Sequence, residues 1–215
     1  TDNVSFMLGS KFEHDDYTGF EWQPSARLAW LVDEQNTFWT SVTRAVRTPN
    51  RATHDLSISF AATPLPNGGA ALISQVGDDS VDSEDVISYE AGYRIQPTQS
   101  TSFDLALFYN DYKTLLADSA GAPTLRTDSL FGTYPVIPFT VNSSASGETL
   151  GAELTAKWQV TNQWLLNGSY SFIDIDLDGG STFVSSEGST PQHQFNVGSR
   201  YSFENGVEWD NYLYY

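Results

Sequence analysis

The chain has 215 residues, and its 10 Lys and Arg stand against 27 Asp and Glu, which gives a formal net charge of -17. Nucleic-acid binding needs a basic face, so this composition argues strongly against a nucleic-acid partner. The chain has no cysteine, which excludes disulfide frameworks and zinc sites with cysteine ligands.

The sequence has no segment typical of a membrane helix or a signal peptide. No stretch approaches the ~18 consecutive apolar residues that a membrane helix needs, and the N-terminus has no basic region followed by an apolar one. Residues 1–12 already have the pattern of a strand, so we expect the chain to be a fragment of a longer protein.

Period-2 alternation of apolar and polar residues recurs along the chain, and helical periodicity does not. In 87–95, for example, every second residue is apolar or aromatic: Ile87, Tyr89, Ala91, Tyr93 and Ile95. Nine segments are expected to be strands: 3–12, 24–32, 37–47, 87–95, 103–109, 150–158, 164–172, 193–203 and 207–215. Most are about ten residues long, as in tilted membrane strands.

The connections between these strands alternate between short and long. Short polar turns are expected at 33–36, 97–100, 160–163 and 204–206, and longer loops at about 13–21, 48–86, 114–147 and 174–191. An outer-membrane barrel has short periplasmic turns and longer extracellular loops. The sequence therefore predicts an all-β fold of antiparallel up-and-down strands from a transmembrane β-barrel, with the long loops outside the cell.

The tryptophans support this prediction. Five of them lie close to a short turn: Trp30, Trp39, Trp158, Trp164 and Trp209. The sixth, Trp22, lies at the other end of its strand. Because indole rings prefer the membrane–water boundary, we predict that all six are membrane-interface aromatics. The alternative, core aromatics of a soluble sandwich, does not explain clustering at one end.

Acidic segments resemble calcium sites only in part. The run from Asp174 to Gly179 matches the first half of a calcium loop, but the Glu expected at its twelfth position is Ser185, and Glu187 comes two places late. We therefore favour an acidic strand end over a calcium site. The carboxylates from Asp78 to Asp85 are interpreted in the same way, as solvated loop residues.

No catalytic or metal-binding motif is evident. The histidines, His14, His54 and His193, lack metal-ligand spacing. Neither a Gly-x-Ser-x-Gly elbow nor a phosphate loop occurs, and nothing selects a pair of carboxylates as acid and base. We predict that the chain is not an enzyme and that it holds no metal or cofactor.

Three of the ten basic residues lie together at the end of one predicted strand: Arg44, Arg47 and Arg51. One interpretation is a cluster facing the barrel lumen that contacts an anionic ligand or a plug. The other, which we favour, is pairing with the surrounding acidic residues.

Several segments also resemble a known family. LGSKFEHDDYTGFEWQPSARLAWLVDEQNTFWTSVTRAVRTPNR (8–51), SEDVISYEAGYRIQPTQSTSFDLALFYNDY (83–112), GETLGAELTAKWQVTNQWLLNGSYSF (147–172) and TPQHQFNVGSRYSF (190–203) resemble the barrel of TonB-dependent outer-membrane receptors. The most specific piece is Arg-Ala-Val-Arg-Thr-Pro at 44–49. The resemblance covers nearly the whole chain and matches the later part of such barrels.

The resemblance implies a fold, partners and a location. These receptors have 22-stranded barrels with a plug, so residues 1–215 would be part of one barrel, without the plug domain and the closing strands. The implied partners are outer-membrane lipid, the plug of the same receptor, the TonB energy-coupling protein and a small-molecule ligand. The implied location is the bacterial outer membrane.

The resemblance also implies active uptake of a scarce ligand such as a ferric siderophore or cobalamin, sometimes a carbohydrate. The residues that we expect to contact ligand lie in loops 48–86 and 114–147, with Arg47, Arg51 and His54 as candidates. Two alternatives remain open at this point: a passive porin-like channel, and a secreted soluble β-protein that binds glycans.

Overall fold

The computed structural model describes residues 3–66, 68–130, 132–179 and 188–215. These residues form twelve strands and one short helix. The elements are β1 (Val4–Asp15), β2 (Gly19–Leu31), β3 (Asn36–Arg47), α1 (Arg51–Asp55), β4 (Ser57–Pro64), β5 (Ala70–Val76), β6 (Glu84–Thr98), β7 (Thr101–Ala120), β8 (Thr124–Asp128), β9 (Gly132–Thr161), β10 (Trp164–Asp178), β11 (His193–Ser202) and β12 (Glu208–Tyr214).

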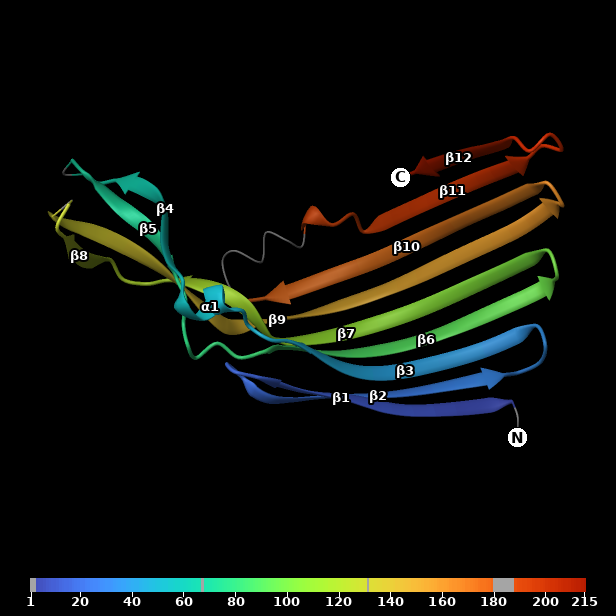
Figure 1. Ribbon diagram of the computed structural model, residues 1–215, viewed down its shortest axis with the longest axis horizontal. Coiled ribbons are helices and arrows are strands. Elements are labelled where there is room, and N and C mark those ends of the chain that lie inside the picture. The colour runs from blue at the N-terminus through green and yellow to red at the C-terminus, as the bar shows by residue number, and fades with distance from the viewer. Residues whose placement is uncertain (1–2, 67, 131, 180–187) are drawn as a thin grey trace.

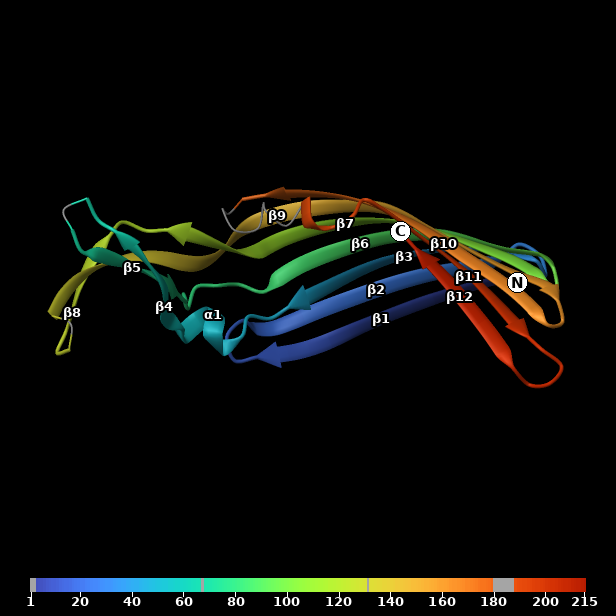
Figure 2. The same cartoon turned by 90° about the horizontal axis from the view of Figure 1, so that it is seen from above.

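Nine of the strands form one antiparallel sheet in the order β1-β2-β3-β6-β7-β9-β10-β11-β12, which we call the wall. The sheet is curved like a section of a cylinder (Figure 2). The four short turns lie together at one end, on the right in Figure 1, and we call the opposite end distal. The prediction of nine up-and-down strands joined by these turns is therefore confirmed.

One face of the wall is apolar across every strand. A single row of cross-strand neighbours consists of Val4, Trp30, Phe38, Tyr93, Leu105, Leu154, Tyr170, Phe195 and Tyr215. Many of these side chains are exposed, and that of Trp30 retains 47% of its accessible surface. A continuous apolar surface of this size is unusual for a protein surrounded by water.

The opposite face is mainly polar, because successive strand residues point to opposite sides. One row of this polar face contains Thr37, Arg94, Asp104, Thr155, Ser169 and Asn196. Its members bond to one another: Arg94 forms an ion pair with Asp104, and Asn196 donates a hydrogen bond to Ser169. The alternation in the sequence thus corresponds to two chemically different faces.

Beyond the distal end of the wall, the structure extends into an arm (left in Figure 1). We define the arm as β4, β5 and β8 together with residues 113–120 of β7 and 132–145 of β9. Within it, β5 lies parallel to β9, with residues 72–76 opposite 136–140. The prediction that 48–86 and 114–147 are loops is therefore wrong for much of their length.

Other boundaries also differ from the prediction. The loop expected at 13–21 is mostly strand, because β1 continues to Asp15 and β2 begins at Gly19. The loop expected at 174–191 is partly strand, because β10 continues to Asp178. Its middle, 180–187, lies outside the described residues.

The apolar core of the described chain lies in and beside the arm. The buried apolar side chains are Ala71, Val81, Ala117, Val136, Val141 and Ala145. Ser74 is fully buried there, and its hydroxyl is 2.7 Å from that of Ser59. Such packing makes the arm a small folded unit and distinguishes it from the wall, which is a single layer.

Helices contribute little to the described residues. None is long and apolar enough to cross a membrane. The helix α1, which the sequence did not predict, is one turn of five residues between β3 and β4.

Candidate functional site at the distal end of the wall

The candidate ligand residues lie where β3 leaves the wall and α1 begins. Arg47 is the last residue of β3. Asn50 caps α1: its side-chain oxygen accepts hydrogen bonds from the backbone amides of Ala52 at 2.8 Å and Thr53 at 3.2 Å. In return, Thr53 Oγ1 accepts a hydrogen bond from the Asn50 amide at 2.9 Å. This reciprocal cap fixes the short helix against the end of the strand.

Arg47 is exposed but not free. Its side chain is 72% exposed, and its Nε forms an ion pair with Glu84. Glu84, the first residue of β6, is only 10% exposed at its side chain and also accepts a hydrogen bond from the Leu116 amide at 2.9 Å. The arginine thus projects outward from a nearly buried carboxylate.

Arg51 and His54 do not converge on Arg47. Arg51 is 85% exposed and forms an ion pair with Asp55, one turn later in α1, at 3.4 Å. His54 is buried, and its ring stacks on Tyr17 with a centroid distance of 4.2 Å. Its Nε2 is buried without a hydrogen-bond partner among the described residues. His54 therefore joins α1 to the turn between β1 and β2 and has no hydrogen bond to Arg47 among the described residues.

The segment after β5 supports α1 from the other side. The Asp78 amide donates a hydrogen bond to the Thr53 carbonyl at 3.0 Å. Hydrogen bonds from the Ser80 hydroxyl and amide hold the pKa of Asp78 below its ordinary value, and the nearby His54 acts in the same direction. The carboxylate therefore stabilises this link in its ionised form.

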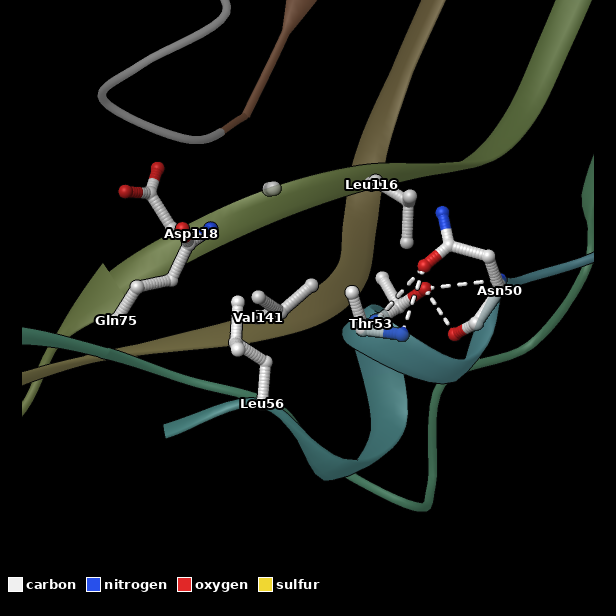
Figure 3. Close-up of a pocket in the computed structure, with 9 residues that line it drawn as sticks. Asn50, Thr53, Leu56, Gln75, Leu116, Asp118 and Val141 are labelled. Atoms are coloured by element: carbon white, nitrogen blue, oxygen red, sulfur yellow. Dashed lines mark hydrogen bonds between the residues drawn. The ribbon is translucent and has the colours of Figure 1, made fainter. Parts of the chain in front are cut away.

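Three adjacent hollows surround the Arg47 region. The first, of about 280 Å³, lies under α1 and is lined by Asn50, Thr53, Leu56, Gln75, Leu116, Asp118 and Val141, with Ala52 and Ala117 (Figure 3). The second, of about 190 Å³, is lined by Arg47, Thr48, Pro49, Asn50, Asp82, Glu84 and Leu116. The third, of about 410 Å³, is lined by Ala45, Val46, Arg47, Glu84, Asp85, Val86, Tyr112 and Leu115.

The ion pair of Arg47 and Glu84 lies between the second and third hollows, since both residues line both of them. The lining of these two hollows combines apolar side chains, the Asn50 amide, the Arg47 guanidinium and the carboxylates of Asp82, Glu84 and Asp85. The apolar side chains and the guanidinium suit a compact ligand that has an apolar part and a negative charge, and such a ligand must compete with Glu84 for Arg47.

Sequence reasoning proposed Arg47 but neither Glu84 nor Asn50, and the role of Arg47 in ligand binding stays a prediction. The acidic run was interpreted as solvated, which is wrong for Glu84 and Asp85, because Asp85 pairs with Arg44 at 2.6 Å. The favoured interpretation of the arginine cluster, pairing with nearby acids, is confirmed by the three ion pairs. An Asn three residues before Thr53 is a cap signal that was available in the sequence.

Five of the six tryptophans lie on the apolar face. Register relates Trp22 to Phe12, Trp30 to Phe38, Trp158 to Leu166, and both Trp164 and Trp209 to Tyr201. Trp39 is different. It lies opposite Gly92 on the polar face, with the Arg27 guanidinium 5.9 Å from its ring centroid. Trp39 therefore does not share the apolar face with the other five, and the membrane-interface role of all six stays a prediction.

The acidic end of β10 was weighed as half of a calcium loop. Asp174, Asp176 and Asp178 alternate along the strand, and Ser185 and Glu187 lie outside the described residues. Among the residues that the structure describes, no group of three or more His, Cys, Asp or Glu is placed to hold a metal ion.

A comparison with family models decides the classification. The model described as "TonB dependent receptor-like, beta-barrel" matches residues 1–215, which is the entire chain. This chain belongs to that family. Its fold is accordingly part of a transmembrane receptor barrel, in which the apolar face of the wall meets lipid and the polar face lines the lumen.

Known relatives agree with the receptor classification. The chain is 24% identical over 186 residues to the probable TonB-dependent siderophore receptor PirA of Acinetobacter baumannii, which covers 82% of this chain and 22% of that protein. The receptor chain described here thus spans about a fifth of the length of this curated relative.

Solved structures show the same fold. The crystal structure of PirA from Acinetobacter baumannii has a TM-score of 0.74 at 16% identity, over 98% of this chain and 30% of that one. A variant of the ferric enterobactin receptor PfeA from Pseudomonas aeruginosa has a TM-score of 0.75 at 16% identity, over 100% of this chain and 30% of that one. The FrpB iron transporter from Neisseria meningitidis has a TM-score of 0.63 at 15% identity, over 98% of this chain and 30% of that one.

Proposed function

We propose that this chain is part of an outer-membrane receptor that takes up a ferric siderophore by TonB-dependent active transport. The observation that carries the proposal is the position of Arg47 between two hollows at the distal end of a receptor wall. The name of the PirA relative supports a siderophore over cobalamin.

The electrostatics favour an anionic ligand at this position. The chain carries a net charge of -17, which repels anions at long range. A guanidinium that is 72% exposed therefore provides local attraction and forked hydrogen bonds for an anion within a surface that is acidic on the whole. Arg51 and His54 have lesser parts in the proposal: Arg51 adds charge beside the entrance, and His54 holds α1 in place.

The remaining parts of the receptor would lie outside this chain. In the described residues β1 and β12 each pair with one neighbour, so the wall has two open edges. We propose that residues 1–215 are one section of a 22-stranded barrel, and that other segments of the whole protein supply the remaining strands and a plug against the polar face. TonB would act on that plug, in the bacterial outer membrane.

Ligand binding to the whole receptor tests the site. The probes are ferric enterobactin, a ferric hydroxamate, cobalamin and a neutral oligosaccharide. We expect Arg47→Ala to weaken binding of an anionic ferric chelate by about 10- to 100-fold, the usual value of a hydrogen bond to a charged group.

Arg94→Ala is the matched control. Arg94 is also an exposed arginine of the polar face with a carboxylate partner, but it lies near the short turns. Its loss should leave affinity unchanged. Unchanged affinity in Arg47→Ala would show that Arg47 is not part of the binding site. If the receptor binds neither ferric chelate, the proposal of a ferric siderophore as ligand is wrong.

Energy dependence separates active uptake from a passive channel. Cells that lack TonB should bind the ferric chelate at their surface but not accumulate it. Continued accumulation without TonB would favour the porin-like alternative.

A further inference from the structure

The base of the arm is held by a small set of polar contacts that meet at residues 82–84. The Ser83 hydroxyl donates a hydrogen bond to Glu21, near the turn between β1 and β2. The Thr114 hydroxyl of β7 donates to the Ser83 carbonyl at 2.6 Å. The Asp82 amide donates to Ser143 of β9 at 2.9 Å. This segment thus joins three separate parts of the distal end.

Glu84 adds two further contacts to the same segment. Its carboxylate holds the Leu116 amide of β7 and the Arg47 guanidinium of β3. Because Glu84 is almost buried and Arg47 is mostly exposed, the ion pair connects the inside of the arm base with the two hollows. Removing the cation from a nearly buried carboxylate is costly, since the charge then lacks its partner.

The backbone of β7 is strained at this level. Thr114 has a φ of 53°, in the left-handed region that a β-branched residue rarely adopts. The pairing of β7 with β9 shifts register between Tyr112 and Leu115, which marks a bulge where β7 leaves the wall. A strained residue persists only where its surroundings hold it, and here the bond from its hydroxyl to Ser83 contributes to holding it.

We propose that Glu84 is a latch that couples ligand binding to the position of the arm. This inference rests on the proposed function, because it makes Arg47 the shared partner of the ligand and of Glu84. Without ligand, the guanidinium stays with Glu84 and the arm base is fixed. An anionic ligand in the adjoining hollows competes for the guanidinium, Glu84 keeps only the Leu116 amide, and the strained bulge at Thr114 relaxes.

Coupling of this kind has a required sign. If ligand binding weakens the ion pair of Arg47 and Glu84, then loss of that ion pair must raise the affinity for the ligand by the same factor. Glu84→Gln removes the competing charge while keeping the size of the side chain and an oxygen for the Leu116 amide. It should therefore strengthen binding of ferric enterobactin by at least about 2- to 5-fold, the range for exposed ion pairs, because the nearly buried Glu84 is screened less than an exposed carboxylate. A contact that merely supports the fold would weaken binding when it is removed.

Distances between the arm and the wall provide the second readout. These 215 residues contain no cysteine, so spin labels can be placed at Ala62→Cys in β4 and Thr98→Cys at a short turn, both exposed, after any cysteine elsewhere in the receptor is replaced by serine. In the whole receptor without ligand, Glu84→Gln and Arg47→Gln should each broaden the distance distribution, and the double variant should broaden it no further. Asp104→Asn, which disrupts the ion pair with Arg94, is the control and should change nothing.

The outcomes separate the latch from the function on which it rests. Ligand-free distributions of Glu84→Gln that match those of the unaltered receptor would overturn the latch, whatever the ligand is. Binding of ferric enterobactin without any shift toward the Glu84→Gln distribution would overturn it as well. If the unaltered receptor does not bind ferric enterobactin, that ligand fails as a substrate, and the ligand-free comparison still decides the latch.

Discussion

Glycines on the polar face of the wall lie beneath large side chains from the neighbouring strand. A Cβ added at Gly92 would lie 2.3 Å from the ring of Trp39. A Cβ at Gly151 would lie 2.1 Å from the ring of Phe108, and one at Gly198 would lie 2.6 Å from Tyr212. Each ring covers a glycine, as in the aromatic pairs that stabilise glycines in sheets. This arrangement lets a polar face carry aromatic residues without projecting them into the lumen.

Substitution of Gly92 tests this packing. Gly92→Ala should lower the free energy of unfolding by about 1–3 kcal/mol, the usual cost of an overpacked site. In a Trp39→Ala background the same change should be nearly neutral, because the three nearest atoms all belong to Trp39. Denaturant unfolding of the whole receptor in detergent measures both values.

Gly168→Ala is the control for this pair, since its Cβ would meet the nearest atom at 3.4 Å. An equal loss from Gly92→Ala in both backgrounds would show that backbone conformation, and not Trp39, requires glycine at this position.

Asp78 gives the distal link a predictable response to pH. Its pKa is lowered mainly by the Ser80 hydroxyl and then by the Ser80 amide. Because the pKa of Asp78 is lower in the folded than in the unfolded protein, its ionised carboxylate stabilises the fold at pH values above the unfolded-state pKa. That stabilisation is lost as the pH falls through the folded-state pKa. Ser80→Ala should therefore move the titration midpoint of Asp78 upward, as followed by its carboxyl NMR signal. An unchanged midpoint would show that the Ser80 hydroxyl has no such influence.

At the scale of elements, α1 depends on its cap far more than on its length. A one-turn helix is too short to be stable by itself, and its residues show no apolar periodicity that a sequence pattern could detect. The reciprocal bonds of Asn50 and Thr53 therefore carry much of its stability. Because Asn50 lines two of the hollows, the cap also shapes the candidate site.

Removal of the cap separates local from global stability. Asn50→Ala should cost about 1 kcal/mol locally, speed amide hydrogen exchange in residues 51–56 and weaken ligand binding, while the unfolding midpoint of the receptor stays nearly unchanged. Asn50→Asp keeps the accepting oxygen and should behave like the unaltered receptor. Normal exchange in Asn50→Ala would mean that packing of His54 on Tyr17 is enough to hold the helix.

The strands of the wall were predictable because the alternation within each strand depends only on the lipid and lumen on its two sides. Alternation in 87–95 or 164–172 reflects lipid on one side and the lumen on the other, and each short turn joins sequence neighbours. The arm was not predictable in this way. Its parallel pairing joins residues 72–76 to 136–140, and no local pattern encodes a contact across that separation. The candidate site was missed in part for the same reason, since Glu84 meets Arg47 only through the pairing of β3 with β6.

At the scale of the whole molecule, stability comes from different sources in the two parts. The arm has buried apolar side chains, as a water-soluble domain does. The wall exposes its apolar face across all nine strands and depends on backbone pairing within the sheet and on lipid around it. This division explains why a chain with many exposed aromatic residues can still be a well-formed fold, and it makes the orientation of each face testable.

Quenching of tryptophan fluorescence by brominated lipids tests that orientation. Trp30 and Trp39 suit a matched comparison, because both lie near the first short turn but on opposite faces. Receptors that retain one of these tryptophans and carry Phe at the other tryptophan positions would be placed in vesicles with bromine on the acyl chains. Trp30 should be quenched strongly, since its ring meets lipid near the membrane boundary. Trp39 should be quenched little, because its ring lies over Gly92 inside the barrel. Equal quenching of the two would mean that the faces are wrongly assigned, and with them the position of Arg94 and Asp104 in the lumen.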